Sequence, residues 1–255
     1  MQNILSLDPS ITTGYAVAQI NPDCNSSIII KYGYLEVDTT SKYVGDWCND
    51  LYEKVKLLIE ENSIKEVCVE DYFFSGKTRS GSNINPAYRA AIHMICRKME
   101  IPYTIINISK WKKHVAGRVR PSKSHYIKYG KSKAQKTYIQ EALWLRYRIK
   151  FPNFCISEKT GRPVVLKYDI VDATAIMIYW LECIKNITSI SVSVPVPENI
   201  EFKRRYSSFI YEEKNIEEDT DTIEPVPNKK KKRSHNPKSN LKKKQGGRSY
   251  NKLFS

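Results

Sequence analysis

Four acidic side chains stand at positions where a carboxylate is costly unless another group neutralises its charge. Asp8 ends the apolar run NILSLD, and Glu70 ends a second run, EVCVE. Asp169 and Asp172 lie three residues apart at the start of DIVDATAIMIYW, whose apolar composition predicts a buried helix. Since each of these carboxylates needs a compensating positive charge, we infer that they share one, supplied by a divalent cation or a pair of cations.

This set of donors predicts the hydrolysis of a phosphodiester. Hard carboxylate oxygens suit Mg²⁺, with Mn²⁺ as a substitute. Two such ions about 4 Å apart can hold the attacking and leaving oxygens, and one of them lowers the pKa of the water that attacks. No serine or cysteine intermediate is then required, so the four acids are expected to be both metal ligands and catalytic groups.

Each acid taken alone also has a structural explanation. Asp8 precedes a proline and could begin a turn, Glu70 could pair with a lysine, and Asp169 suits the first turn of a helix. Asp172 is harder to explain in this way, because its neighbours in the predicted helix are apolar. Asp71 should point to the opposite side of its strand from Glu70, so we expect it to be a bystander.

The elements that must position these acids follow from hydrophobic periodicity. The first 37 residues predict three strands in an antiparallel meander. Two further strands are expected in KEVCVED and IPYTIINI, and helices are expected over residues 44–61, 85–99, 109–116, 132–148 and 168–185. Residues 117–131 are expected to form a basic loop, with Ser132 as the cap of the helix that follows.

This order predicts a mixed α/β sheet with helices on both faces. If the first and fourth strands pair, Asp8 and Glu70 end neighbouring strands, where ligands gather in open α/β sheets. Asp169 and Asp172 are separated by nearly one helical turn, so their carboxylates share a face that can point at those strand ends.

Net charge is +15 over 255 residues, and it is unevenly placed. Residues 103–150 hold thirteen Lys or Arg residues and a single acid, Glu141. Residues 212–224 are acidic, whereas residues 228–255 hold eleven Lys or Arg residues and no acid. An anionic polymer is the natural partner. The alternative, a basic face that is merely solvated, is weakened by the lack of interspersed acids.

Several other classes of protein are disfavoured by the sequence. The six cysteines contain no C-x-x-C pair, which gives a structural zinc site little support and suits a reduced, intracellular compartment. The chain has no apolar run of the roughly 18–20 residues that a membrane span needs, and no signal-peptide features at its start, so membrane insertion and secretion are not expected. His114 and His125 are candidates for phosphate contacts.

A family resemblance rests on three acidic segments, LSLDPSITTGYAVA, VCVEDYFF and YDIVDATAIMIYW. They resemble the acidic motifs of the RuvC-like Holliday junction resolvases, which belong to the RNase H-like superfamily. A fourth segment, KKHVAGRVRPSKSHYIKYGKSKAQKTYIQ, resembles the family's lysine-bearing region. The similarity spans roughly residues 1–185. It implies an RNase H-like mixed five-stranded sheet flanked by helices, dependence on Mg²⁺ or Mn²⁺, and a homodimer that binds branched DNA.

The resemblance also implies roles for individual residues. The four acids match the family's catalytic carboxylates, Lys133 matches an active-site lysine, and either Lys112 or Lys113 matches an earlier one. Phe73 matches an aromatic side chain that stacks on a base, although core packing is its alternative. Attraction to the DNA backbone is the alternative for each lysine. The residues expected to contact DNA are Phe73, Lys77, Lys112, Lys113, Arg118, Arg120, Lys131 and Lys136.

Two features depart from the compact bacterial pattern. Residues 118–131 interrupt the lysine-bearing region, and the chain continues for ~70 residues past the last acidic motif. In length and lysine content it is more similar to the resolvases of large DNA viruses. We expect an RNase H-like nuclease domain over 1–187, an extended arm or edge segment over 188–211, and a disordered tail over 212–255. The basic end could direct nuclear import, placing the protein at a nuclear or viral replication site, or bind DNA nonspecifically.

Three functional hypotheses follow. The first is a Mg²⁺-dependent endonuclease that resolves four-way DNA junctions as a homodimer. The second keeps the fold but acts on another DNA branch or on an RNA–DNA hybrid. The third is a non-catalytic DNA-binding or packaging protein that uses residues 103–150 and the tail.

Overall fold

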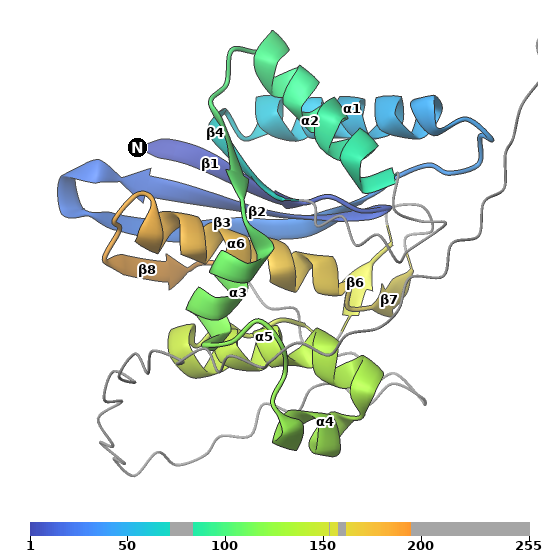
Figure 1. Ribbon diagram of the computed structural model, residues 1–255. Helices are drawn as coiled ribbons and strands as arrows, with labels where there is room; N and C mark the ends of the chain where they lie inside the picture. Colours follow the sequence, from blue (N-terminus) through green and yellow to red (C-terminus); the bar gives the residue numbers. More distant parts are fainter. Residues whose placement is uncertain (72–83, 153, 158–161, 195–255) are drawn as a thin grey trace, which may run out of the picture. The chain divides into compact units, whose positions relative to one another are not determined.

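A mixed six-stranded sheet forms the centre of the part of the chain that the computed structural model describes, residues 1–71, 84–152, 154–157 and 162–194 (Figure 1). Its strands run in the spatial order β5-β4-β1-β2-β3-β8. Their bounds are β1 Gln2–Asp8, β2 Thr12–Asn21, β3 Ser26–Glu36, β4 Ile64–Glu70, β5 Tyr103–Ile106 and β8 Ser189–Val192. A separate two-stranded sheet pairs β6 (Phe154–Ile156) with β7 (Pro163–Val165).

Strand directions bring two of the four acids to one edge of the sheet. The first three strands form an antiparallel meander, in which a short 3₁₀ helix, Pro22–Cys24, joins the second and third. On the other side of β1, β4 and then β5 run parallel to it. Leu7 lies opposite Val69, so Asp8 and Glu70 are the next residues of two neighbouring parallel strands.

Six helices accompany the sheet in the described residues: α1 Val44–Glu61, α2 Ile84–Lys98, α3 Ile108–Ala116, α4 Lys123–Tyr129, α5 Lys131–Tyr147 and α6 Tyr168–Cys183. The helices divide between two apolar cores, one on each face of the sheet, because alternate strand residues face opposite sides. Leu5 and Leu7 pack in the core that contains α1 and α2, whereas Ile4 packs in the core that contains α3, α5 and α6 (Figure 1). Within the described residues, no helix combines the length and apolar character of a membrane span.

The predicted fold class is confirmed, with one strand more than expected. The antiparallel meander, the parallel strands beyond β1 and the helices on both faces form the mixed α/β arrangement predicted as RNase H-like. The sixth strand, β8, adds parallel to β3 at the edge of the sheet. The hairpin of β6 and β7 was not predicted, because each of its strands is only three residues long and carries little periodicity.

Two local predictions about the lysine-bearing region are wrong. Part of the expected loop over 117–131 is the helix α4, which begins after Ser122, whose hydroxyl accepts a hydrogen bond from the backbone N–H of His125 at 3.1 Å. Gly130, at φ +74°, separates it from α5. The expected Ser132 cap is also absent from α5, which begins one residue earlier without a side-chain cap. Basic residues and flanking glycines concealed this short capped helix.

Candidate active site

Asp8 and Glu70 come together at the ends of β1 and β4. The Asp8 residue is only 8% exposed, and its carboxyl group shares a hydrogen bond with that of Glu70. Burial, and then the charge of Glu70, raise the pKa of Asp8 well above its ordinary value. A carboxyl group that shares a proton with another acid in this way is one that a bound cation would stabilise in its ionised form.

Gly14 allows α6 to bring the other two acids to this place. It lies on β2 directly opposite Asp8, and a Cβ atom built on it would stand 1.9 Å from the backbone carbonyl oxygen of Asp169. The missing side chain therefore lets the first turn of α6 lie directly on the sheet. As a result, Asp169 and Asp172 face the ends of the strands that carry Asp8 and Glu70.

Charge interactions connect the four acids. After burial and Glu70, Asp172 and Asp169 are the next causes that raise the pKa of Asp8. Burial also raises the pKa of Asp172, from its ordinary 3.8 to about 7, with further contributions from Glu70 and Asp169. Burial likewise raises the pKa of Asp169. Four buried carboxyl groups so close together do not stabilise the fold unless another group compensates their charge.

The chemistry of these donors fits a divalent cation. Carboxylate oxygens are the ligands that Mg²⁺ and Mn²⁺ prefer, and a positive ion would relieve both the burial cost and the repulsion. In the described residues, however, no three His, Cys, Asp or Glu side chains are arranged around one point as metal ligands would be. The acids interact through their charges, and closure around an ion requires side-chain movement.

Two neutral donors orient individual carboxylates, and the sequence analysis missed both. Trp111 of α3 is fully buried, and its indole N–H donates to Oε1 of Glu70 at 2.9 Å. The Ser10 hydroxyl lies 3.1 Å from Oδ1 of Asp169. A serine two residues after the first acid was a weak sequence signal, whereas a tryptophan in a short amphipathic helix looks like an ordinary core residue. Such donors hold a ligand in one orientation.

Positive charges from two helices act on the acids. Lys112 of α3 lowers the pKa of Glu70 and of Asp172, in opposition to the larger effect of burial. The sequence left Lys112 and Lys113 as alternatives, and the structure places the charge of Lys112 toward the acids while Lys113 is exposed on the same helix. Burial dominates at Asp169 as well, where Lys167 and Lys136 lower the pKa.

The other predicted site residues spread over the basic lobe formed by α3, α4 and α5, or fall outside the described residues. The ammonium group of Lys133 lies over the ring of Tyr129 of α4, 5.7 Å from its centroid. The exposed predicted DNA contacts on this lobe are Lys113, Arg118, Arg120, Lys131 and Lys136. Phe73 and Lys77 lie outside the described residues. Asp71, the expected bystander, forms an ion pair with Arg89 of α2.

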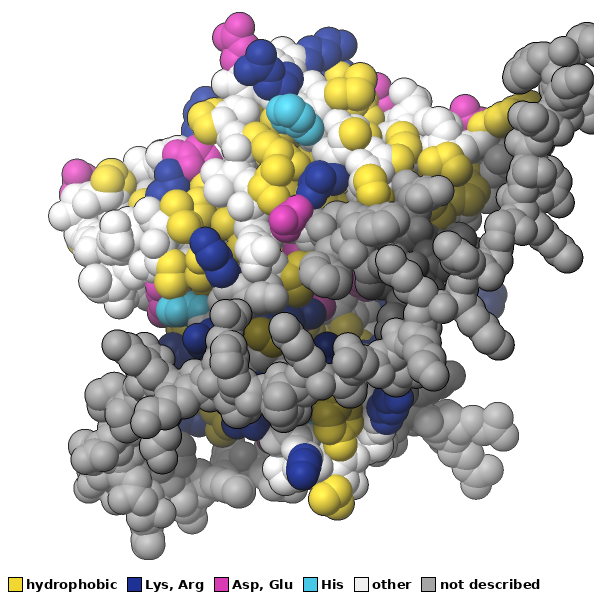
Figure 2. Space-filling model, in the orientation of Figure 1, with side chains coloured by type: hydrophobic (Ala, Val, Ile, Leu, Met, Phe, Trp, Pro, Cys, Tyr) yellow, Lys and Arg dark blue, Asp and Glu magenta, His cyan; other side chains and the backbone are white. Residues whose placement is uncertain are grey.

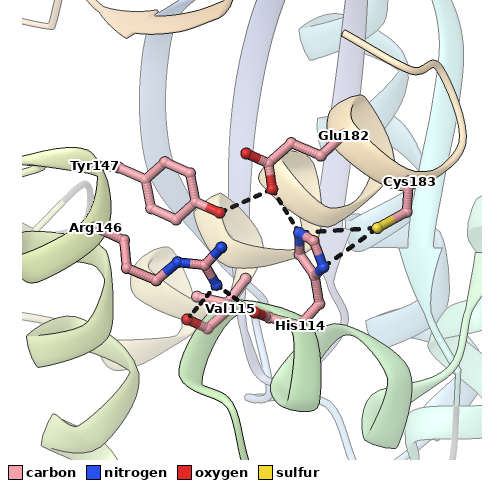
Figure 3. Close-up of polar contacts among 6 residues, drawn as sticks. All are labelled: His114, Val115, Arg146, Tyr147, Glu182 and Cys183. Atoms are coloured by element: carbon pink, nitrogen blue, oxygen red, sulfur yellow. Dashed lines mark hydrogen bonds and ion pairs between the residues drawn. The ribbon is translucent and has the colours of Figure 1, made fainter. Parts of the chain in front are cut away.

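A second polar cluster joins the helices that carry the site (Figure 3). His114 of α3 pairs with Glu182 of α6, which also accepts a hydrogen bond from the Tyr147 hydroxyl of α5 at 2.8 Å. The Sγ atom of Cys183 lies 3.3 Å from Nδ1 of His114, and the Arg146 guanidinium donates to carbonyl oxygens at the C-terminal end of α3. The cluster lies at the opposite end of α6 from the acids, so its evident effect is to fix the three helices relative to one another.

No family model and no curated protein matches the sequence of this chain. Several similar solved structures are Holliday junction resolvases. Thermus thermophilus RuvC is 12% identical with a TM-score of 0.48, and the match covers 73% of this chain and 98% of that one.

Two further resolvases are similar at the same level. Yeast mitochondrial Ydc2 is 15% identical with a TM-score of 0.42, covering 71% of this chain and 78% of that one. The fowlpox virus resolvase is also 15% identical, with a TM-score of 0.40 and coverage of 71% and 99%. At these identities and TM-scores, we base the functional proposal on the chain's own residues.

Proposed function

We propose that the protein is a Mg²⁺-dependent endonuclease that cuts branched DNA, with four-way junctions as its substrate and Mn²⁺ as an alternative cation. One observation carries the proposal: Asp8, Glu70, Asp169 and Asp172 come from three separate elements, and the charges of the other three acids raise the pKa of Asp8 while those of Glu70 and Asp169 raise the pKa of Asp172. A basic lobe that attracts nucleic acid lies beside them.

Each acid has a distinct place in the proposed chemistry. Two bound cations supply a lowered pKa for the attacking water and positive charge beside the leaving oxygen. Asp8 and Asp172 are the ligands whose protons must leave before a cation binds, because burial and mutual repulsion favour their protonated forms. Glu70 is held at Oε1 by Trp111, so its second oxygen is the one available to a cation.

Lysines complete the proposed site. Lys112, whose charge already acts on Glu70 and Asp172, is placed to stabilise the negative charge that develops on the phosphate. Lys136 of α5 acts on Asp169, and its ammonium group lies over the ring of the preceding residue, Tyr168. Lys133 sits one turn before Lys136 on the same helix, in contact with α4. We assign Lys112 to the reacting phosphate, and Lys133 and Lys136 to the neighbouring DNA backbone.

The proposal includes a homodimer. A single chain carries one set of four acids, whereas resolution of a four-way junction requires a cut in each of two opposed strands. Two copies of the chain would supply both sites. The expected observation is a protein that sediments as a dimer and releases two nicked duplexes through symmetric cuts.

The decisive experiment compares a synthetic four-way junction with a flap, a linear duplex and an RNA–DNA hybrid, each with and without Mg²⁺. We expect cuts in the junction only with the cation. Asp8→Asn, Glu70→Gln and Asp172→Asn should retain junction binding but lose cleavage, because each removes a ligand and also a charge that repels phosphate.

Other outcomes identify the alternatives. Preferred cutting of the hybrid or the flap would keep the nuclease chemistry and replace the substrate. If Asp172→Asn left every activity intact and removal of residues 228–255 abolished DNA binding, the protein would be a non-catalytic DNA-binding protein, and the proposed function would be wrong.

A further inference from the structure

Residues 118–131, which interrupt the lysine-bearing region, contain the short helix α4. The solvent-exposed face of this helix has an unusual composition. On α4, the residues exposed to solvent are Lys123, Ser124, Ile127 and Lys128. Ile127 is 86% exposed, more than any other large hydrophobic side chain in the described residues. Helical spacing places Ile127 on the same face as Lys123, one turn away, whereas Lys128, the next residue, points about 100° around the helix and lies over the ring of Tyr129. The outer face is therefore an apolar tip with one cation, Lys123, beside it.

Buried contacts hold this helix on α5. His125 is only 8% exposed, and its Nδ1 pairs with Glu141 at 2.8 Å. Its Nε2 lies 2.9 Å from the hydroxyl of Thr137, a buried residue of α5. Just before α4, the Tyr138 hydroxyl donates to the Val119 carbonyl at 2.9 Å. The expectation that His125 contacts phosphate is therefore wrong, because its ring faces inward and anchors the helix.

The same anchor connects α4 to the acids. Tyr138, which holds Val119, is itself buried beside the active site: burial raises its pKa, and the charges of Asp172 and Glu70 raise it further. Tyr138 thus connects the segment just before α4 with the part of α5 on which the charges of Asp172 and Glu70 act.

The surroundings of the tip identify its partner as a polyanion. Residues 117–131 contain no Asp or Glu. Burial lowers the pKa of His125, Glu141 opposes this, and the positive charges of Lys128 and Arg118 add to the lowering, so the charge of Arg118 acts on α4 from outside the helix. Figure 2 shows Lys and Arg side chains beside hydrophobic ones over the lobe that carries α4 and α5. A protein partner would also meet the apolar tip, but charge complementarity favours nucleic acid.

We propose that Ile127 is a wedge that packs against an unstacked base at the branch point of DNA, while Lys123, on the same face of α4, contacts a neighbouring phosphate. Apolar side chains inserted at a base step are a known way to hold distorted DNA. Single exposed apolar residues are common on protein surfaces. Ile127 differs from them because a buried histidine anchors its helix, because Lys123 shares its face, and because residues 117–131 contain no acid. The inference rests on the DNA-binding part of the proposed function and not on the four acids.

The test uses the full chain without divalent cation, so that no cleavage occurs. A four-way junction carries 2-aminopurine beside the branch point, and its fluorescence reports unstacking. We expect wild-type protein to increase the fluorescence. Ile127→Ser should remove most of this increase and weaken junction binding about tenfold, the loss expected when one large aliphatic side chain no longer packs. Binding to a linear duplex of the same length should be unchanged.

Leu57→Ser is the matched control. Leu57 is 55% exposed on α1, a helix of the opposite core, and its replacement should change neither signal. Ile127→Ser carries little risk of unfolding, because its side chain lies almost wholly in solvent. Unchanged fluorescence and junction affinity would overturn the proposal, as would an equal loss of affinity for junction and duplex. A change in oligomeric state without a change in DNA binding would instead assign α4 to contact between copies of the chain.

These outcomes separate the two proposals. If the wild-type protein binds the junction through Ile127 but never cuts it with Mg²⁺, the wedge stands and the nuclease proposal fails. If it cuts the junction and Ile127→Ser unstacks the branch as well as wild type does, the nuclease stands and the wedge fails.

Discussion

Replacement of Asp172 by asparagine should stabilise the metal-free protein at neutral and higher pH. Asp172 lies among three other acids, and burial raises its pKa from 3.8 to about 7. At pH 8 it is ionised in the folded chain against burial and repulsion, whereas in the unfolded chain it is ionised freely. Asparagine keeps the size of the side chain without the charge, so the folded state no longer bears this cost.

The magnitude follows from linkage. Raising the pKa of Asp172 from 3.8 to about 7 disfavours its ionised form by ~4 kcal/mol, at about 1.4 kcal/mol for each pKa unit. Because the folded state holds the proton more tightly, stability falls as the pH rises from about 4 to about 7, and the loss is complete above that range. The variant should lack this loss, so the gain at pH 8 approaches ~4 kcal/mol, or roughly 10 °C in Tm.

The assay is chemical denaturation of both proteins at pH 5 and pH 8, with and without Mg²⁺. At pH 5, where Asp172 is protonated in the folded chain but ionised in the unfolded one, the variant should be more stable by about 1.6 kcal/mol, and at pH 8 without metal by ~4 kcal/mol. Mg²⁺ should stabilise the wild type at pH 8 and affect the variant much less. Asp23→Asn, at an exposed acid in the turn after β2, is the control and should show no such pattern.

A variant less stable than wild type at pH 8, or one with the same dependence on pH, would refute the reasoning. It would mean that Asp172 has a favourable partner in the folded state, and the four acids would then be a structural network rather than a site prepared for a cation.

Three further predictions concern the residues that hold the site. Trp111→Phe keeps a buried aromatic ring but removes the hydrogen-bond donor to Glu70. The Mg²⁺ concentration for half-maximal cleavage should therefore rise about 10- to 100-fold, with little change in junction affinity. An unchanged metal requirement would show that the hydrogen bond does not orient Glu70. Gly14→Ala places a Cβ atom against the backbone of α6. Denaturation should show a loss of stability of ~1–3 kcal/mol, and the junction assay should show no cleavage. Normal activity would show that α6 need not approach the sheet so closely. Lys112→Ala should lower the rate of cleavage about 100-fold in single-turnover measurements, because the charge of Lys112 acts on the acids. Lys113→Ala should change DNA affinity alone. Equal effects of the two variants would contradict the assignment of Lys112 to the phosphate.

Local patterns were enough to find the acids and most of the elements that carry them. Asp8 and Glu70 were recognisable because each ends a short apolar run, and an acid at the end of a buried strand has few structural uses. The spacing of Asp169 and Asp172 put both on one face of a helix whose apolar length was evident. The fold class followed from the order of these elements, because three antiparallel strands followed by alternating helices and strands allow few topologies.

Tertiary structure decided which residues support the acids. The approach of α6 to Gly14, the bond from Trp111 to Glu70 and the choice of Lys112 over its neighbour all join residues distant in sequence. The helix in the lysine-bearing region is another case, because its anchor is a contact between the His125 ring and the Glu141 carboxyl group on the next helix. Periodicity records which side of an element is buried, but it carries no information on the partner buried against it, and these contacts exist only once the chain has folded.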